Sequence, residues 1–395
     1  MFKISFTTSG ESHGKGLVGI IEGIPANLEI SEAYINSHLS RRQKGYGRGG
    51  RMKIESDSVE ILSGIRWGRT LGSPIALLIR NRDWINWEKG MSPDAAHRDS
   101  IEPVTRPRPG HADLPGIIKY KQSDIRNILE RSSARETAMR VALGSIARRF
   151  LEEFRIFIGS FVTSLGGIEL AIDTSGLDED TLTNLHKKAE GSELRCPDQE
   201  VTERMKKLID RAKEEGYSLG GRFVTFATGL PPGLGSHIQW NRRLDARLAY
   251  AFMGIQAIKA VEIGDGVAIS GKPGFEVLDE ILPPQKGKTL LNARRTTNHA
   301  GGIEGGMTNS MPVIVKATMK PIPTQRKPLR SFDIKTGQPV EAAYERSDVC
   351  AIAAASVIGE AAMALTLTDA FLEKFGGDSM EEVQRNYLSY MEAGG

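Results

Sequence analysis

The segment 348–373 constrains the fold most, because it is rich in alanine and nearly all apolar. A surface helix carries an apolar stripe and a polar face, whereas a helix that is apolar on all sides has to be covered by other elements. We therefore predict that this segment is a buried helix. The chain has 395 residues, of which 39% are hydrophobic, and this is enough for one large core or two smaller ones.

Short strands and helices alternate along the rest of the chain. Runs rich in Val, Ile, Phe and Leu that are bounded by Gly or Pro predict strands. These runs are 16–22, 59–63, 74–80, 156–163, 221–228, 261–263 and 311–319. Further helices are predicted at 31–42 after an N-cap at Ser31, at 133–154 with a capping box from Ser133 to Glu136, at 198–215 before Gly216, and at 241–260.

The domain organisation follows from the absence of a Ser- or Pro-rich linker. We predict one domain over 1–395, with a C-terminal tail over 376–395 whose order the sequence leaves open. The sequences GIPANL at 23–28 and GLPPGL at 229–234 each follow a predicted strand and precede a predicted helix. This repeat hints at two similar halves in one fold, although Gly-x-Pro turns are common enough for chance to explain it.

Composition and charge are those of an ordinary globular protein. The net charge of +3 is too small to imply nucleic-acid binding by itself. Two cysteines in so long a chain, Cys196 and Cys350, fit a reducing cytoplasm better than a disulfide. We expect no membrane span and no signal peptide, because no apolar run reaches transmembrane length and the first residues alternate like a strand.

Two loops present a histidine in a setting that favours contact with a ligand. In GESHG at 10–14, glycines on both sides let the backbone bring His13 to a strand end, where it could protonate a leaving group. A loop histidine bonded to the backbone is the alternative. In RPRPGHAD at 106–113, alternating prolines stiffen the loop, and Asp113 could orient the imidazole of His111.

The tract RRQKGYGRGGR at 41–51 contains five cationic residues and four glycines. Guanidinium groups suit phosphate or carboxylate, and flexible glycines suit closure over a ligand. RNA binding is a rival function, because Arg-Gly-rich segments bind nucleic acid by charge and stacking. The tract is short and lies between segments that are predicted to be folded. We therefore favour binding of a small anionic ligand, rank a solvated loop without a ligand second, and rank RNA binding third.

The segment RSSAR at 131–135 opens the helix predicted at 133–154. A helix N-terminus offers N–H groups and the positive end of the dipole, so this segment predicts a phosphate site. The alternative to a phosphate site is ordinary helix capping by Ser133, which would not explain the presence of Arg131 and Arg135. Weaker candidates are the Gly-rich turn at 298–309, the constrained loop at 320–324 and the acid at 346–348, each of which ordinary turns also explain.

Several other site classes lack their sequence patterns. The seven histidines form no HxH or HExxH pattern and the two cysteines no CxxC, so we expect no metal site. There is no GxxxxGK[ST] phosphate loop, no strand–GxGxxG–helix unit and no GxSxG elbow.

In this order, the motifs resemble those of the chorismate synthase family. The match rests on GESHG at 10–14, SRRQKGYGRGGR at 40–51, RPGHAD at 108–113, RSSARETAMRVA at 131–142, GIQAIKAVEIGDG at 254–266, NHAGGIEGGMTN at 298–309 and RSD at 346–348. Separate blocks in one order form a far more specific signal than any single motif. The segment 170–218 and the tail beyond 375 carry none of these blocks.

The resemblance implies an α+β fold: a β-α-β sandwich of two antiparallel sheets packed with helices, with internal pseudo-two-fold halves, assembled as a homotetramer. It also implies a carbon–oxygen lyase that removes phosphate from 5-enolpyruvylshikimate-3-phosphate by anti-1,4-elimination to give chorismate. The implied cofactor is reduced FMN (FMNH2), with NADPH or an external flavin reductase as the source of electrons. No nucleic-acid or membrane partner is implied.

The resemblance further implies roles for individual residues. His13 protonates the departing phosphate, His111 manages the protonation of the reduced flavin, and Asp348 helps to deprotonate flavin N5. The substrate or NADPH positions are Arg42 and Arg48, with Arg135 as a further substrate contact. The FMN positions are Arg131, Ser132, Ser133, Gln256, Ala257, Gly305, Lys320, Pro321, Ile322, Pro323, Thr324 and Arg346. Because Pro323 stands where the family often has serine, we expect backbone contacts there and no hydroxyl contact.

Two other functions compete with this one. An RNA-binding module would use the tract at 41–51, and its affinity would fall steeply with salt. A flavin oxidoreductase would carry out its own NADPH step, which the sequence does not distinguish from delivery of flavin already reduced.

Overall fold

The computed structural model describes residues 3–47, 56–344 and 348–394. The N-terminal strands form one antiparallel sheet in the order β1-β2-β6-β3. Its strands are β1 (Ser5–Ser9), β2 (Gly16–Glu22), β6 (Ile75–Arg80) and β3 (Val59–Ser63). Alternate residues of β2, among them Leu17 and Ile21, are buried, as expected of a strand with one face on the core.

A second antiparallel sheet has the order β10-β15-β9-β7-β8. Its strands are β10 (Ile258–Ile263), β15 (Val313–Met319), β9 (Gly221–Thr228), β7 (Phe157–Leu165) and β8 (Ile168–Glu169). Unlike β2, strands β7 and β9 contain continuous buried runs, because both faces of this sheet are covered. Phe226 packs with helix α5 (Glu179–Glu190) on one face, and Phe223 contacts Phe252 on the other.

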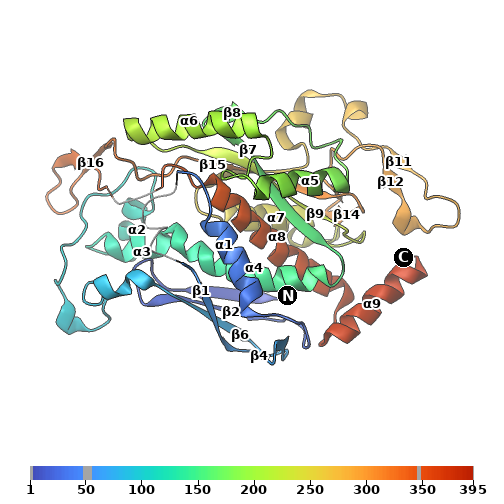
Figure 1. The fold of residues 1–395 in the computed structure, drawn as a ribbon, viewed down its shortest axis with the longest axis horizontal. Helices are drawn as coiled ribbons and strands as arrows, with labels where there is room; N and C mark the ends of the chain where they lie inside the picture. The colour runs from blue at the N-terminus through green and yellow to red at the C-terminus, as the bar shows by residue number, and fades with distance from the viewer. Residues whose placement is uncertain (1–2, 48–55, 345–347, 395) are drawn as a thin grey trace.

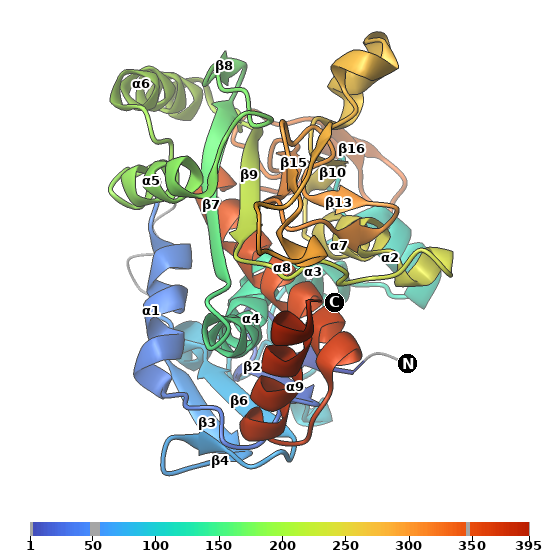
Figure 2. The ribbon, with the colours of Figure 1, turned by 90° about the vertical axis from the view of Figure 1, so that its right-hand side faces the viewer.

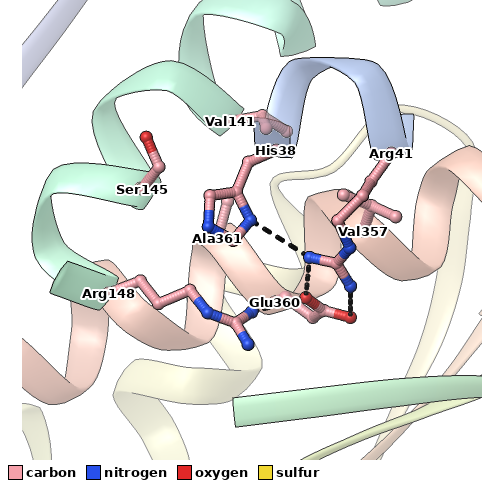
Figure 3. Close-up of a pocket in the computed structure, with 9 residues that line it drawn as sticks. His38, Arg41, Val141, Ser145, Arg148, Val357, Glu360 and Ala361 are labelled. Carbon is pink, nitrogen blue, oxygen red and sulfur yellow. Dashed lines mark hydrogen bonds and ion pairs between the residues drawn. The ribbon is translucent and has the colours of Figure 1, made fainter. Parts of the chain in front are cut away.

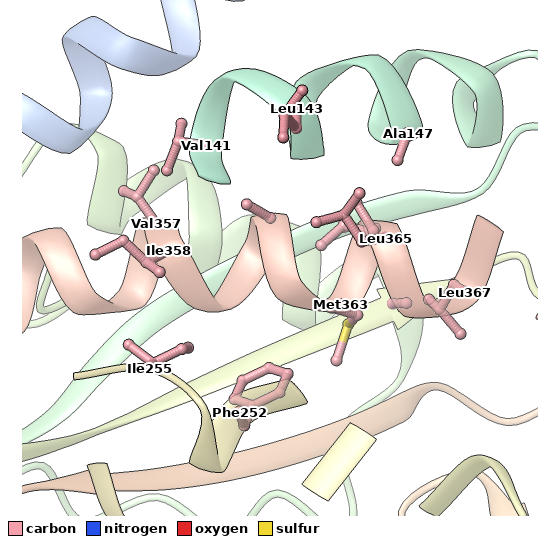
Figure 4. Close-up of a cluster of buried hydrophobic side chains, with 14 of the residues drawn as sticks. Val141, Leu143, Ala147, Phe252, Ile255, Val357, Ile358, Met363, Leu365 and Leu367 are labelled. Atoms are coloured by element: carbon pink, nitrogen blue, oxygen red, sulfur yellow. The ribbon is translucent and has the colours of Figure 1, made fainter. Parts of the chain in front are cut away.

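Helices α4 (Thr137–Glu152) and α8 (Ile352–Phe375) pack along each other between the two sheets (Figure 1; Figure 2). A Cβ on Gly144 would lie 2.5 Å from that of Ala361, so these small residues permit the close approach. Figure 4 shows Val141 and Leu143 of α4 above α8, with Phe252 below it. Each large apolar side chain that is fully buried here stabilises the fold by about 1.5–3 kcal/mol.

Helix α8 is the buried helix predicted from its apolar sequence. It is long and apolar enough to cross a membrane, contrary to our expectation that no segment reaches that length. However, 94% of its most apolar window is buried inside the protein, so α8 is a core helix. The mixture of antiparallel sheets and separate helices confirms the α+β class.

The remaining helices surround this centre. They are α1 (Glu32–Gln43), α2 (Asp113–Tyr120), α3 (Arg126–Ser132), α6 (Gln199–Glu215), α7 (Leu244–Met253) and α9 (Met380–Ala393). The predicted caps at Ser31 and Gly216 are confirmed. The helix predicted at 241–260 is shorter, because the chain turns into β10 after α7. Within the segment 376–395, α9 packs Tyr387 against Phe371.

Short strand pairs complete the fold. They are β4 (Ile65–Arg66) with β5 (Arg69–Thr70), β11 (Ile281–Leu282) with β12 (Arg294–Arg295), β13 (Ile303–Glu304) with β14 (Met307–Thr308), and β16 (Arg330–Phe332) with β17 (Pro339–Glu341).

Candidate functional site

The loop between β1 and β2 carries His13. Gly10 adopts a φ of 108°, and a Cβ there would lie 2.3 Å from the carbonyl oxygen of Gly16, so this turn needs glycine. The backbone N–H of Ser12 donates to the carbonyl oxygen of Glu130 (3.0 Å). The N–H of His13 donates to the carboxylate of Glu130 (2.8 Å). Helix α3, which bears Glu130, therefore fixes the main chain of this loop.

The imidazole of His13 is held at its edge and at its face. Nδ1 lies 2.9 Å from both carboxylate oxygens of Glu130, and the ring centroid lies 4.4 Å from that of Trp87. Burial alone would raise the pKa of Glu130, but hydrogen bonds from His13 and the charges of His13 and Arg126 outweigh it and lower that pKa. Glu130 is therefore an anion at neutral pH. It accepts the Nδ1 proton, which makes Nε2 the other ring nitrogen and the candidate for proton exchange with a ligand.

Arg42 and Arg135 meet at one buried carboxylate, that of Asp57. Arg135 pairs with Asp57 through Nη1, and Arg42 Nη1 lies 3.6 Å from the other oxygen. Arg135 Nε also donates to Asn81 (3.0 Å), whose amide donates to the carbonyl oxygen of Gly14 (2.8 Å). Both guanidinium groups are buried, and their planar donors suit a phosphate or carboxylate group.

The segment Arg131–Ser133 lies at the end of a helix, and our prediction of a helix N-terminus there is wrong. Arg131 and Ser132 are the last residues of α3, where the dipole is negative. The predicted capping box is also wrong, because Ser133 caps a single 3-10 turn (Ala134–Glu136), and α4 begins only at Thr137. The dipole therefore does not attract phosphate here.

Positive charge in this region comes from the side chain of Arg131. Its guanidinium donates to the carbonyl oxygens of Thr8 (2.8 Å) and Gly10 (3.2 Å). The hydroxyl of Thr8 donates to Glu136 (2.7 Å), which also accepts from the amide of Gln256 (3.1 Å). These contacts connect the first histidine loop to the residues that precede β10.

The imidazole of His111 is held by Asp113. Nδ1 lies 2.5 Å from Oδ1 of Asp113, and Arg108 donates to both oxygens of this carboxylate (2.8 and 3.0 Å). Burial alone would raise the pKa of Asp113, but hydrogen bonds from His111 and Arg108 and the charge of Arg108 lower it well below its usual range. The geometry agrees with the prediction that Asp113 orients the ring.

The segment after β15 touches the second histidine loop at two points. Lys320 Nζ donates to the carbonyl oxygen of Gly110 (2.5 Å), and the hydroxyl of Thr324 accepts from Arg108 (3.0 Å). The backbone N–H of Lys320 donates to the carbonyl oxygen of Ala257 (2.9 Å). The structure therefore brings the 256–257 segment, the 320–324 segment and the His111 loop together. Between Lys320 and Thr324 lie Pro321, Ile322 and Pro323, which the family resemblance predicts to contact FMN.

Comparison with known proteins decides the family. A family model described as chorismate synthase matches residues 4–372. The chain belongs to the chorismate synthase family. The chorismate synthase of Aquifex aeolicus (strain VF5) is 57% identical over 391 residues, which cover 98% of this chain and 97% of that relative. The chorismate synthase of Geobacter sulfurreducens is 55% identical over 393 residues, 98% of each chain.

A crystal structure described as chorismate synthase is similar over nearly the whole fold. It has a TM-score of 0.80 and 47% sequence identity, and the match covers 99% of this chain and 98% of that chain. The resemblance inferred from the motifs is therefore confirmed. As a member of the chorismate synthase family, the chain is an enzyme of the lyase class.

Gln256 offers a test of whether the residues fit the flavin that the chorismate synthase family implies. Its Oε1 is buried and has no hydrogen-bond partner among the described residues. A buried acceptor without a donor is unfavourable, and a ligand N–H group would relieve that cost. Ala257 adopts a φ of 67°, which is uncommon for a residue other than glycine. With Lys320 nearby as a cation, these residues fit an anionic cofactor that carries N–H groups.

The structure does not place all the predicted site residues. Arg48 and Arg346 lie outside the described residues. Asp348 lies beside the Arg-Gly tract, because the N–H of its neighbour Val349 donates to the carbonyl oxygen of Gly47 (3.1 Å). Asp348 therefore lies next to the tract at 41–51, for which an anionic ligand is predicted.

Gly305 occupies the tip of the β13–β14 hairpin. Both Gly305 and Gly306 have positive φ, 57° and 83°, as a two-residue hairpin turn requires. The carbonyl oxygen of Gly306 accepts from Leu244 of α7 (2.9 Å). Within the described residues, these contacts lead to α7 rather than to the histidine loops, so the FMN contact of Gly305 stays a prediction.

Sequence reasoning missed Glu130, Asp57 and Asn81. Glu130 lies 117 positions from His13, and no sequence pattern pairs them. One pattern in the sequence indicates that Glu130 is buried: it directly follows the apolar pair Ile128 and Leu129 on a short helix. A buried carboxylate is rarely found without a charged or hydrogen-bonding partner.

A separate polar cluster surrounds Glu360 of α8 (Figure 3). The cavity beside it, lined by His38, Arg41 and Arg148, measures about 10 Å3. This is room for at most one water molecule. Burial, followed by the charges of Arg148 and Arg41, lowers the pKa of His38 to about 3, so this imidazole is neutral. The cavity is too small to be the ligand site.

Three potential metal ligands also meet here. Ligand atoms of His186, Glu190 and Glu360 lie within 4.8 Å of one another. Both carboxylates are already paired with Arg41 and Arg195, so the cluster is electrically satisfied without a cation. We assign it a structural role.

Proposed function

We propose that this member of the chorismate synthase family removes phosphate and a ring hydrogen from 5-enolpyruvylshikimate-3-phosphate by an anti-1,4-elimination. The product is chorismate, and the reaction is the last common step of the shikimate pathway. The observation that supports this proposal is the setting of His13 and His111. Each has Nδ1 held by a buried carboxylate, and a chain of hydrogen bonds connects the two loops that carry them. Proton transfer at two fixed imidazoles is what loss of phosphate beside a reduced cofactor requires.

Each proposed substrate residue has a task that its surroundings support. His13 delivers the Nε2 proton to the departing phosphate, which leaves as the carbon–oxygen bond breaks. Arg42 and Arg135, which meet at Asp57, bind the anionic substrate, because a guanidinium group suits phosphate and carboxylate. We assign Arg48 to the same task on family resemblance.

The cofactor would be reduced FMN, held by the segments that converge on the His111 loop. When bound, reduced FMN would supply transient electron donation to the reacting substrate. We assign His111 and Asp348 to proton management beside the cofactor on family resemblance. The residues proposed to bind FMN are Arg131, Ser132, Ser133, Gln256, Ala257, Gly305, Lys320, Pro321, Ile322, Pro323, Thr324 and Arg346.

The source of the reduced flavin separates two forms of this proposal. Either the chain reduces FMN with NADPH, or an external flavin reductase supplies FMNH2. Loss of flavin absorbance after NADPH is added to the protein and oxidised FMN would identify the first form. A cytoplasmic location is supported by the low number of cysteines, Cys196 and Cys350, in a chain of 395 residues.

We also propose the finer fold, a β-α-β sandwich with two related halves. Strand order supports it, since β1-β2-β6-β3 in the first sheet corresponds to β7-β9-β15-β10 in the second. In each half a helix follows the second strand in the chain, and α4 or α8 follows the last. Gly23 and Gly229 both have positive φ, and both approach the backbone just before a neighbouring strand.

A homotetramer is supported by apolar side chains on the segment 266–292. Phe275, Leu278 and Leu290 are 85%, 73% and 81% exposed, an unusual density for a surface that stays in water. We expect Phe275→Asp to shift the mass measured by light scattering from tetramer to smaller species. Trp67→Asp, at a residue 87% exposed on the β4–β5 hairpin, is the control. Equal masses for both variants would contradict this assignment.

Turnover provides the direct test of the proposed function. We expect the pure protein, incubated without oxygen with chemically reduced FMN and 5-enolpyruvylshikimate-3-phosphate, to release phosphate and form an equal amount of chorismate. Phosphate is measured colorimetrically and chorismate by its absorbance. The proposal does not survive a failure to form chorismate with FMN demonstrably bound and reduced.

A further inference from the structure

The carboxylate of Glu130 is buried against the imidazole of His13. We propose that Glu130 is a positioning residue that fixes the ring of His13 through a charge-assisted hydrogen bond to Nδ1, so that Nε2 is directed toward the substrate. The inference rests on the proposed function, because Glu130 acts only through the proton that His13 delivers.

The contacts of Glu130 constrain both the backbone and the ring of His13. Its side chain is 1% exposed and accepts from the backbone N–H of His13 and from Nδ1. Its own carbonyl oxygen accepts from Ser12. Trp87 covers one face of the imidazole at 4.4 Å. With the edge and a face held, the ring has little freedom to rotate, and the direction of Nε2 is set before a ligand arrives.

Glu130 also pairs with an arginine of its own helix. Arg126, one helical turn earlier on α3, lies 3.1 Å from the same carboxylate. Hydrogen bonds from His13 and the charges of His13 and Arg126 together lower the pKa of Glu130 against the effect of burial. A carboxylate anion on Nδ1 forms a charge-assisted hydrogen bond, which holds the ring more firmly than a neutral acceptor would.

The same arrangement occurs at the second histidine. Asp113 binds Nδ1 of His111, and Arg108 pairs with that carboxylate as Arg126 does with Glu130. Each histidine is thus backed by a buried carboxylate that has its own arginine. Such contacts also satisfy a buried acid elsewhere, as Asp265 pairs with His299 and Lys316. The arrangement therefore supports the positioning role through the geometry at His13 and not through its repetition.

The test is a double-mutant cycle on kcat. We expect Glu130→Gln, which keeps the shape and removes the charge, to lower kcat about 10- to 100-fold, as loss of a charge-assisted hydrogen bond would. The KM for the substrate and the Kd for FMN should stay at wild-type values. In a His13→Ala background, Glu130→Gln should cause little further loss, because a residue that acts through His13 has nothing left to position.

The outcomes separate this inference from the proposed function. If the wild type forms no chorismate, the proposed function fails. If the wild type is active and Glu130→Gln equals it, or lowers kcat equally with and without His13, the positioning role fails. Glu130→Asp retains the charge that Arg126 needs and guards against misfolding of the amide variant. Its kcat should lie between those of the wild type and Glu130→Gln, and a value at or below that of the amide variant would also overturn the inference.

Discussion

Replacement of His13 or His111 by alanine is expected to lower the turnover of 5-enolpyruvylshikimate-3-phosphate by roughly two to four orders of magnitude, the usual contribution of a positioned proton donor. FMN affinity should change far less, because each variant removes an imidazole whose Nδ1 is already bound to protein rather than to a ligand. The measurement is phosphate release under anaerobic conditions, paired with titration of FMN binding.

His237→Ala provides the matched control for these variants. This histidine is exposed and lies far along the chain from both loops, so turnover should match that of the wild type. Normal turnover by both the His13 and the His111 variants would contradict the assigned roles. A parallel loss of flavin binding and turnover would show that these residues hold the cofactor instead of moving protons.

The sequence predicted the elements that depend on local pattern. Strand β2 follows from an apolar run bounded by glycine, and helix α8 follows from continuous apolarity; both form where expected. The predicted start of helix α4 is wrong. Ser133 and Glu136 have the spacing of a capping box, but the carboxylate of Glu136 accepts hydrogen bonds from Thr8, Arg140 and Gln256 instead. Spacing cannot reveal that a distant strand offers a competing partner.

The Arg-Gly tract shows a second limit of sequence reasoning. Arg41 and Arg42 are adjacent and were assigned to one ligand-binding loop, but successive helical side chains diverge by about 100°. Arg41 therefore reaches Glu360, and Arg42 reaches Asp57. Both side chains are largely buried, so they do not form the exposed basic surface that an RNA strand would need, and this does not exclude a small ligand that enters the site.

Replacement of Glu360 by glutamine is expected to lower the free energy of unfolding by about 3–5 kcal/mol, the usual cost of leaving buried charges without their partner. Glu360 lies within the apolar helix α8 and accepts from Arg41, Arg148 and Arg195 at 2.7–3.0 Å. Without the charge of Glu360, Arg41 and Arg195 would retain Glu190 as a carboxylate partner, and Arg148 would retain Glu152. Urea denaturation of both proteins measures the difference, and Glu60→Gln, in an exposed pair with Arg80, should change stability by at most about 1 kcal/mol.

The pH dependence of stability tests the same cluster independently. Burial alone would raise the pKa of Glu360, but the charges of Arg41, Arg148 and Arg195 outweigh it and hold that pKa well below its ordinary value of 4.5. A carboxyl with a lowered pKa in the folded state stabilises the protein above its unfolded pKa, and this contribution is lost as pH falls through the folded value. Wild-type stability should therefore decline below about pH 4.5 more steeply than that of Glu360→Gln. Parallel pH profiles would show that Glu360 does not carry the charge that holds α1, α4 and α8 together.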